Sequence, residues 1–236
     1  MSGENFYLLT SLPALGELGS QPPLSLQDFL EHVAPAPQVR GLVEVLLLGD
    51  DLRQREALLA GEIDEVAPAV LTENQVRNEE PLPAPLATGE AEQPPAARLQ
   101  TDAVWEAYYR HVRGLATPGS FLALWVGHEV GLRNAFAAAR AKALDLEVDR
   151  YLVAADLGAG ADGFAAVVSE WSAAPTPLAG LQVVDAARWD WLTAHDGWFT
   201  FADDELTAYA AKLMLLHRWN RIAEARARQE GAPAEG

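Results

Sequence analysis

The chain is organised around its last long segment, Phe201-Ala-Asp-Asp-Glu-Leu-Thr-Ala-Tyr-Ala-Ala-Lys-Leu-Met-Leu-Leu-His-Arg-Trp-Asn-Arg-Ile-Ala-Glu-Ala-Arg-Ala-Arg228. Apolar side chains recur in it every three or four residues, which predicts a long helix with one apolar face. The face consists of Leu206, Tyr209, Leu213, Leu216, Trp219 and Ile222. Acidic residues at its start and arginines at its end suit the helix dipole. This stretch therefore predicts a long core helix of an all-α protein.

Helical periodicity also runs through most of the remaining chain. Almost no stretch alternates with the period of two that a half-buried strand shows. We therefore predict an all-α fold, either a multi-helix bundle or a funnel-like helical domain, with little or no sheet. Ser25 is well placed as an N-cap, with Asp28 as its acidic partner in the first turn of the next helix.

Punctuating residues predict the borders of several helices. Residues 38–48 predict a buried helix, Gly49-Asp50-Asp51 a turn, and residues 52–60 a second helix. Thr117-Pro118 predicts the cap and start of a long helix over residues 119–146. Near the beginning of the chain, residues 6–13 predict an extended segment or a single turn closed by proline.

The composition changes between Asn78 and Pro95, where prolines and glutamates crowd together and no periodicity survives. A segment of this kind buries too little apolar surface to fold by itself. We predict an acidic, Pro-rich linker or long loop over residues 78–100. It would separate an N-terminal helical portion, residues 1–77, from a C-terminal helical bundle, residues 101–236.

The net charge of −17 argues against two classes of binding partner, nucleic acid and anionic lipid. Phosphate binding depends on clustered Lys and Arg, so this charge weighs against nucleic acid. The same charge disfavours adsorption to anionic lipid. The first residues lack the basic region of a signal peptide, and the apolar runs fall short of the roughly 20 residues of a membrane span. The absence of cysteine fits a reducing compartment, and we predict a cytoplasmic protein.

The segment Gly158-Ala-Gly-Ala-Asp-Gly163 matches the pattern G-x-G-x-x-G. Its functional interpretation is a dinucleotide-binding turn, which needs alternating strands and helices around it. The flanking sequence predicts no such alternation, so an interhelical loop is favoured. A nucleotide-binding enzyme that uses this loop remains the less favoured alternative.

The sequence contains no complete catalytic or metal-binding pattern. His128-Glu129 does not begin H-E-x-x-H, because Leu132 stands where the second histidine is required. No nucleophile turn of the form Gly-x-Ser-x-Gly occurs. We therefore predict a protein that is not an enzyme, with no catalytic residue, no metal ligand and no cofactor.

Stretches at both ends of the chain carry a resemblance to a known family. They are Tyr7-Leu-Leu-Thr-Ser-Leu-Pro-Ala-Leu15, Pro22-Pro-Leu-Ser-Leu-Gln-Asp-Phe-Leu30, Asp185-Ala-Ala-Arg-Trp-Asp-Trp-Leu192 and Leu206-Thr-Ala-Tyr-Ala-Ala-Lys-Leu-Met-Leu-Leu-His-Arg-Trp219. Together they resemble a bacterial family of unassigned function whose genes lie among those of V-type (archaeal-type) ATPase subunits. In the middle, Glu129-Val-Gly-Leu-Arg-Asn134, followed by Arg140, is similar to a helix of the C (or d) subunit.

The C/d subunit is an all-helical funnel that sits on the membrane rotor ring and receives the central shaft. The resemblance therefore implies a non-catalytic V-type ATPase/ATP synthase subunit that links the shaft to the proteolipid ring in proton or other ion transport. Its implied partners are those ATPase subunits, with no nucleic acid and no direct membrane span. Its implied location is peripheral, at the inner membrane through the complex. An assembly factor or accessory protein of the same complex is the alternative.

Overall fold

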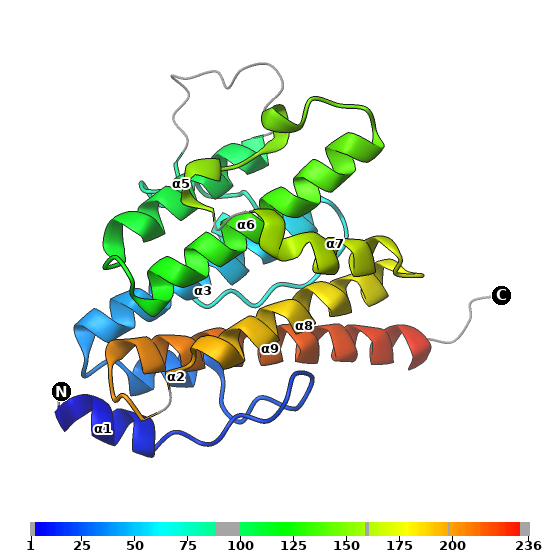
Figure 1. The fold of residues 1–236 in the computed structure, drawn as a ribbon. Helices are drawn as coiled ribbons and strands as arrows, with labels where there is room; N and C mark the ends of the chain where they lie inside the picture. Colours follow the sequence, from blue (N-terminus) through cyan, green and yellow to red (C-terminus); the bar gives the residue numbers. More distant parts are fainter. Residues whose placement is uncertain (1–2, 88–99, 159–160, 198, 232–236) are drawn as a thin grey trace. The chain divides into compact units, whose positions relative to one another are not determined.

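The computed structural model describes residues 3–87, 100–158, 161–197 and 199–231. Within these residues the chain forms helices and turns and no strand, which confirms the predicted all-α fold (Figure 1). The helices, with 3₁₀ helices labelled η, are α1 (Gly3–Thr10), α2 (Leu26–His32), α3 (Pro37–Leu59), α4 (Glu73–Val76), α5 (Gln100–Leu115), α6 (Phe121–Ala143), η1 (Val148–Tyr151), η2 (Ala155–Leu157), η3 (Ala161–Phe164), α7 (Ala165–Ser172), α8 (Pro177–His195) and α9 (Asp203–Gly231).

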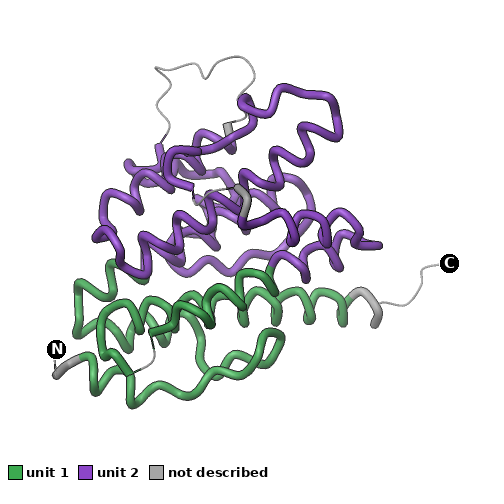
Figure 2. Tube along the Cα trace, viewed as in Figure 1, with its two compact units in different colours: residues 1–43, 185–236 green, residues 44–184 purple. Residues whose placement is uncertain are grey.

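The chain forms two compact units, which Figure 2 colours separately. Unit 1 combines residues 1–43 with residues 185–236, and unit 2 consists of residues 44–184. The borders fall inside α3 and inside α8. They lie elsewhere than the linker predicted over residues 78–100. Residues 88–99 of that segment lie outside the described residues, so the linker stays a prediction.

Helix α9 is the central element of unit 1. The sequence predicts one apolar face, but the middle of the helix is buried on nearly all sides. Fully or almost fully buried side chains include Leu206, Ala208, Ala210, Ala211, Leu213, Met214, Leu215 and Leu216. A helix that is apolar all round belongs to a core, and its alanines allow close approach. The prediction of a single face was therefore too narrow.

Helices α1 and α2 contact α9 within unit 1. Phe29 of α2 stacks on Tyr209 of α9, with ring centroids 5.3 Å apart. The predicted cap at Ser25 is confirmed, because its hydroxyl accepts the Asp28 N–H at 3.0 Å while the Asp28 carboxylate accepts the Ser25 N–H. This capping box fixes where α2 begins.

Helix α3 is continuous, so the turn predicted at Gly49-Asp50-Asp51 is wrong. A Cβ at Gly49 would lie only 2.6 Å from the hydroxyl oxygen of Tyr108, which leaves room there for glycine alone. The carboxylate of Asp51 accepts the backbone N–H groups of residues 69, 70 and 71, each at 2.8 Å. These residue types are typical of turns, but here tertiary contacts override local preference.

Two other helix borders also differ from the sequence prediction. Residues 3–10 form α1, where the sequence predicted an extended segment or a single turn. Helix α6 begins after Ser120, whose hydroxyl accepts the Ala123 N–H at 3.4 Å, so Thr117 is not its cap. Ser and Thr are both good N-caps, and which of them is used depends on the path of the chain before the helix.

Helix α6 is the central element of unit 2. It contacts α5, α7 and the 3₁₀ helices η1, η2 and η3. Leu132 and Phe136 of α6 form a buried cluster with Phe164, and Val167, Trp171 and Val184 are among the residues packed against it. Unit 2 is thus organised around the helix that carries the stretch from Glu129 to Arg140.

Candidate functional site

The carboxylate of Glu129 lies in the interior of unit 2, with only 3% of its side chain exposed. The Arg53 guanidinium of α3 donates a hydrogen bond to it at 2.5 Å. A buried carboxylate is costly unless it is paired and hydrogen-bonded. The ion pair thus fixes α6 against α3.

Two guanidinium groups lie over the ring of Trp105 in α5. The Cζ atoms of Arg53 and Arg133 lie 5.6 and 5.0 Å from the centre of its ring. Its indole N–H donates to Glu56 at 3.0 Å, and Arg133 also donates to Asp102 at 3.1 Å. Cation–π contacts and charge-assisted hydrogen bonds therefore join α3, α5 and α6 around one indole.

Asn134 and Arg140 make two further internal contacts of α6. The Asn134 side chain donates to the Val153 carbonyl and accepts the Val153 N–H, both at 2.9 Å. The Arg140 guanidinium lies 5.0 Å from the centre of the Trp171 ring. Glu129, Asn134 and Arg140 thus each hold a different neighbour of α6 in place, and the three do not converge on one site.

Gly158 packs closely against α6. A Cβ at this position would lie 3.2 Å from Val130 Cγ1 and 3.4 Å from the Gly131 nitrogen. Residues 159–160 of the G-x-G-x-x-G segment lie outside the described residues. The described residues on either side form η2 and η3, and no strand precedes or follows them within the described chain. This setting supports the interhelical loop, because a dinucleotide turn requires a strand before it.

His128 belongs to an aromatic cluster. Its ring stacks on Trp125 with centroids 5.9 Å apart and meets the Phe164 ring edge-on at 5.3 Å. Its Nδ1 lies 3.7 Å from the Glu129 carboxylate. Across the described ranges, no group of three His, Asp or Glu side chains is arranged to hold a metal ion.

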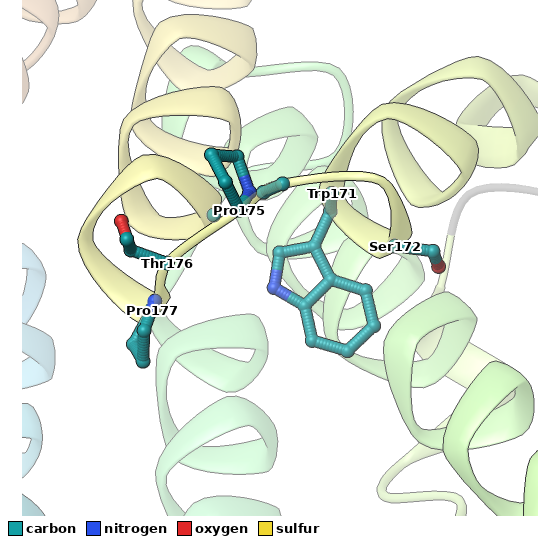
Figure 3. Close-up of a pocket in the computed structure, with 7 residues that line it drawn as sticks. Trp171, Ser172, Pro175, Thr176 and Pro177 are labelled. Carbon is teal, nitrogen blue, oxygen red and sulfur yellow. The ribbon is translucent and has the colours of Figure 1, made fainter.

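A pocket of about 420 Å³ opens between the end of α7 and the start of α8. Figure 3 shows the Trp171 ring facing the segment from Pro175 to Pro177. The pocket is lined by Trp171, Ser172, Ala174, Pro175, Thr176, Pro177 and Gly180. The lining combines apolar side chains with the hydroxyls of Ser172 and Thr176 and carries no acid–base group.

Two buried carboxylates have unusual surroundings. Burial raises the pKa of Asp51 to about 6, although its three backbone N–H donors oppose the rise. In unit 1, Oδ1 of the fully buried Asp185 accepts hydrogen bonds from Arg188 at 2.7 Å and Arg218 at 3.2 Å. Both carboxylates hold pieces of their own unit together, Asp51 the 69–71 segment and Asp185 helices α8 and α9.

The chain matches no protein-family model, no curated protein and no solved structure. Every helix among the described residues is too short or too polar to cross a membrane. The sequence prediction singled out Glu129, Asn134 and Arg140 but missed Asp51 and Arg53. An available signal was the pair Asp50-Asp51 inside a long apolar run, where an unsupported carboxylate is costly.

Proposed function

We propose that this protein is a non-catalytic, C/d-like subunit of a bacterial V-type ATPase/ATP synthase, which links the central rotor shaft to the membrane proteolipid ring. The observation that carries the proposal is that the four stretches that resemble the ATPase-linked family all lie in one unit of the structure. Residues 7–15, 22–30, 185–192 and 206–219 are far apart in the sequence and all belong to unit 1. The resemblance therefore describes one folded body and not a set of scattered segments.

Specific contacts join these stretches. The Tyr209 hydroxyl donates to the Pro13 carbonyl at 2.8 Å, and His217 Nε2 lies 2.8 Å from the Leu24 carbonyl oxygen. Arg218 reaches Asp185 at 3.2 Å, which connects the last two stretches. Residues that resemble the family are thus the residues that hold unit 1 together.

The build of unit 2 supports the same role. A part that transmits torque between a shaft and a ring has to resist deformation, and buried, fully packed helices do so. Helix α6 is fixed to α3 through Glu129, to α5 through Arg133 and to the segment at Val153 through Asn134. These contacts favour a stiff coupling element.

Purification of the ATPase from the native host, through a tag on a different subunit, tests the proposal. We expect this protein in the active, membrane-derived complex at a constant ratio to the tagged subunit, and expect loss of ATP-driven ion pumping in a deletion strain. A deletion strain that yields an intact, pumping complex would refute the proposal. If the protein appears only in partly assembled complexes, the alternative of an assembly factor replaces it.

A further inference from the structure

Three exposed aromatic side chains and one half-buried phenylalanine form a patch on unit 1. Tyr7 and Phe199 are 74% and 72% exposed, and Phe6 is 47% exposed. Phe201 connects them, because its ring centre lies 5.2 Å from that of Phe6 and 6.4 Å from that of Phe199. We call Phe6, Tyr7, Phe199 and Phe201 the aromatic patch. Clustered exposed aromatic rings of this kind mark interaction surfaces.

The backbone beneath the aromatic patch is strained. Phe199 and Phe201 have φ angles of +59° and +51°, in the left-handed region that bulky residues rarely adopt. Strain of this kind persists only where the surroundings enforce it, and it concentrates at functional positions. One of the strained residues, Phe199, also has an exposed ring, although burial of such a ring would favour folding.

Polar contacts enforce the strained conformation. The Glu205 carboxylate accepts the N–H of Phe199 at 3.1 Å and the N–H of Phe201 at 2.9 Å. The buried Asn5 side chain donates to the Phe201 carbonyl at 3.2 Å and to the Asp203 carboxylate at 2.8 Å. Side chains of α1 and of the start of α9 therefore hold the backbone at Phe199 and Phe201 in one conformation.

The two segments that carry the patch have acidic side chains and no Lys or Arg. Residues 1–39 and 196–211 contain no Lys and no Arg, whereas Asp203, Asp204 and Glu205 open α9 directly after Phe201. The next cation along the chain, Lys212, is paired with Asp196 at 2.7 Å. An apolar surface with acidic neighbours complements a partner that combines apolar and basic side chains.

We infer that the aromatic patch docks a basic amphipathic helix of another protein. Such a helix places apolar residues on the rings and Lys or Arg beside the carboxylates. A second copy of this chain is disfavoured, because each copy carries a net charge of −17. Anionic lipid is disfavoured for the same reason. The inference goes beyond the proposed function and does not depend on it.

Binding to two model peptides tests the charge requirement. One labelled helical peptide has leucine on one face and lysine on the other, and its twin has glutamate in place of lysine. We expect the lysine peptide to bind the full-length protein about ten-fold more tightly at physiological salt, measured by fluorescence anisotropy. Equal affinity for the two peptides would overturn the inference.

Variants of the patch locate the binding surface. We expect Phe199→Gly and Tyr7→Ser each to weaken binding of the lysine peptide about ten-fold, as for aromatic residues at the centre of an interface. Phe199→Gly also relieves the left-handed strain, so this variant should unfold at the same temperature as the wild type or higher. Leu144→Ser is the matched control, because Leu144 is 69% exposed and lies in unit 2. Binding that Phe199→Gly and Tyr7→Ser leave unchanged would refute the assignment.

A photo-cross-linking residue at position 7, introduced in the native host, identifies which molecule binds the aromatic patch. The inference requires links to one protein, at a segment with positive net charge and helical apolar spacing. Links to a second copy of this chain or to an acidic segment would contradict it. Binding to phosphatidylcholine vesicles that Phe199→Gly abolishes would assign the aromatic patch to lipid instead.

Discussion

Gly49 lies directly beneath Tyr108, so close that a Cβ at position 49 would be 2.6 Å from the tyrosine hydroxyl oxygen. The Tyr108 side chain is buried, and its hydroxyl donates to the Leu46 carbonyl at 3.4 Å. Glycine inside a helix costs about 1 kcal/mol relative to alanine. In α3 a glycine stands at position 49 because only glycine leaves room for the Tyr108 side chain of α5.

Replacement of Gly49 separates helix propensity from packing. We expect Gly49→Ala to lower the free energy of unfolding by about 1–3 kcal/mol, because the added methyl group overpacks the contact with Tyr108. Gly41→Ala is the control on the same helix, since a Cβ there meets nothing within 4 Å. Gly41→Ala should stabilise the protein by up to about 1 kcal/mol. Urea denaturation measures both effects, and a stabilised Gly49→Ala variant would contradict this account.

Removal of the Asp51 carboxylate should loosen the segment at residues 69–71. In Asp51→Ala three backbone N–H groups lose their acceptor, so we expect a loss of about 2–3 kcal/mol in the free energy of unfolding. Hydrogen exchange of the amides of residues 69, 70 and 71 should accelerate first. Asp64→Ala, at an exposed position, should change neither quantity. Unchanged exchange rates in Asp51→Ala would show that the bonds do not hold the segment.

The same carboxylate makes stability depend on pH. Burial raises the pKa of Asp51 to about 6, against about 3.9 in an unfolded chain. Between these values the folded protein binds more protons than the unfolded chain. The contribution of Asp51 is therefore fully present below about pH 4, and about 3 kcal/mol is lost as the pH rises through 6. The difference in unfolding free energy between wild type and Asp51→Ala, followed across this range, measures it. A difference that rises with pH would contradict the sign.

Asn134 should prove more important for stability than its small side chain suggests. Asn134→Ala removes both hydrogen bonds to Val153, and we expect a loss of about 1–3 kcal/mol. Asn134→Asp keeps the acceptor for the Val153 N–H but places an oxygen against the Val153 carbonyl, so it should not restore the loss. Asn220→Ala, which removes one exposed contact to Glu224, should cost only a few tenths of a kcal/mol, about what an i,i+4 pair contributes. Thermal or urea denaturation ranks the three variants.

The sequence predicted the helical class because apolar spacing is a local signal that survives any tertiary arrangement. Ser25 was identified as a cap for the same reason, since its partner Asp28 is only three residues away. The segment at Gly49-Asp50-Asp51 misled the prediction because its partners, Tyr108 and residues 69–71, are distant in the sequence. A turn and a helix there have similar local chemistry, and only the distant contacts decide between them.

The candidate residues show the same division. Glu129, Asn134 and Arg140 stood out as a pattern, but their partners Arg53, Val153 and Trp171 come from other elements, which a pattern does not specify. The left-handed backbone at Phe199 and Phe201 carries even less sequence signal, because phenylalanine normally avoids it. It depends on Glu205 and Asn5, two side chains with many other uses.

Unit 1 combines residues 1–43 with residues 185–236, and this division sets an order for biosynthesis. Helices α1 and α2 leave the ribosome long before α9 exists to cover them. At about 5–20 residues per second, translation of the intervening residues 44–184 takes roughly 7–28 s. Unit 2 can fold during that interval, whereas the apolar faces of α1 and α2 stay uncovered until α9 has been synthesised. We therefore expect the N-terminal segment to be the part of the newly synthesised protein that stays unpacked longest.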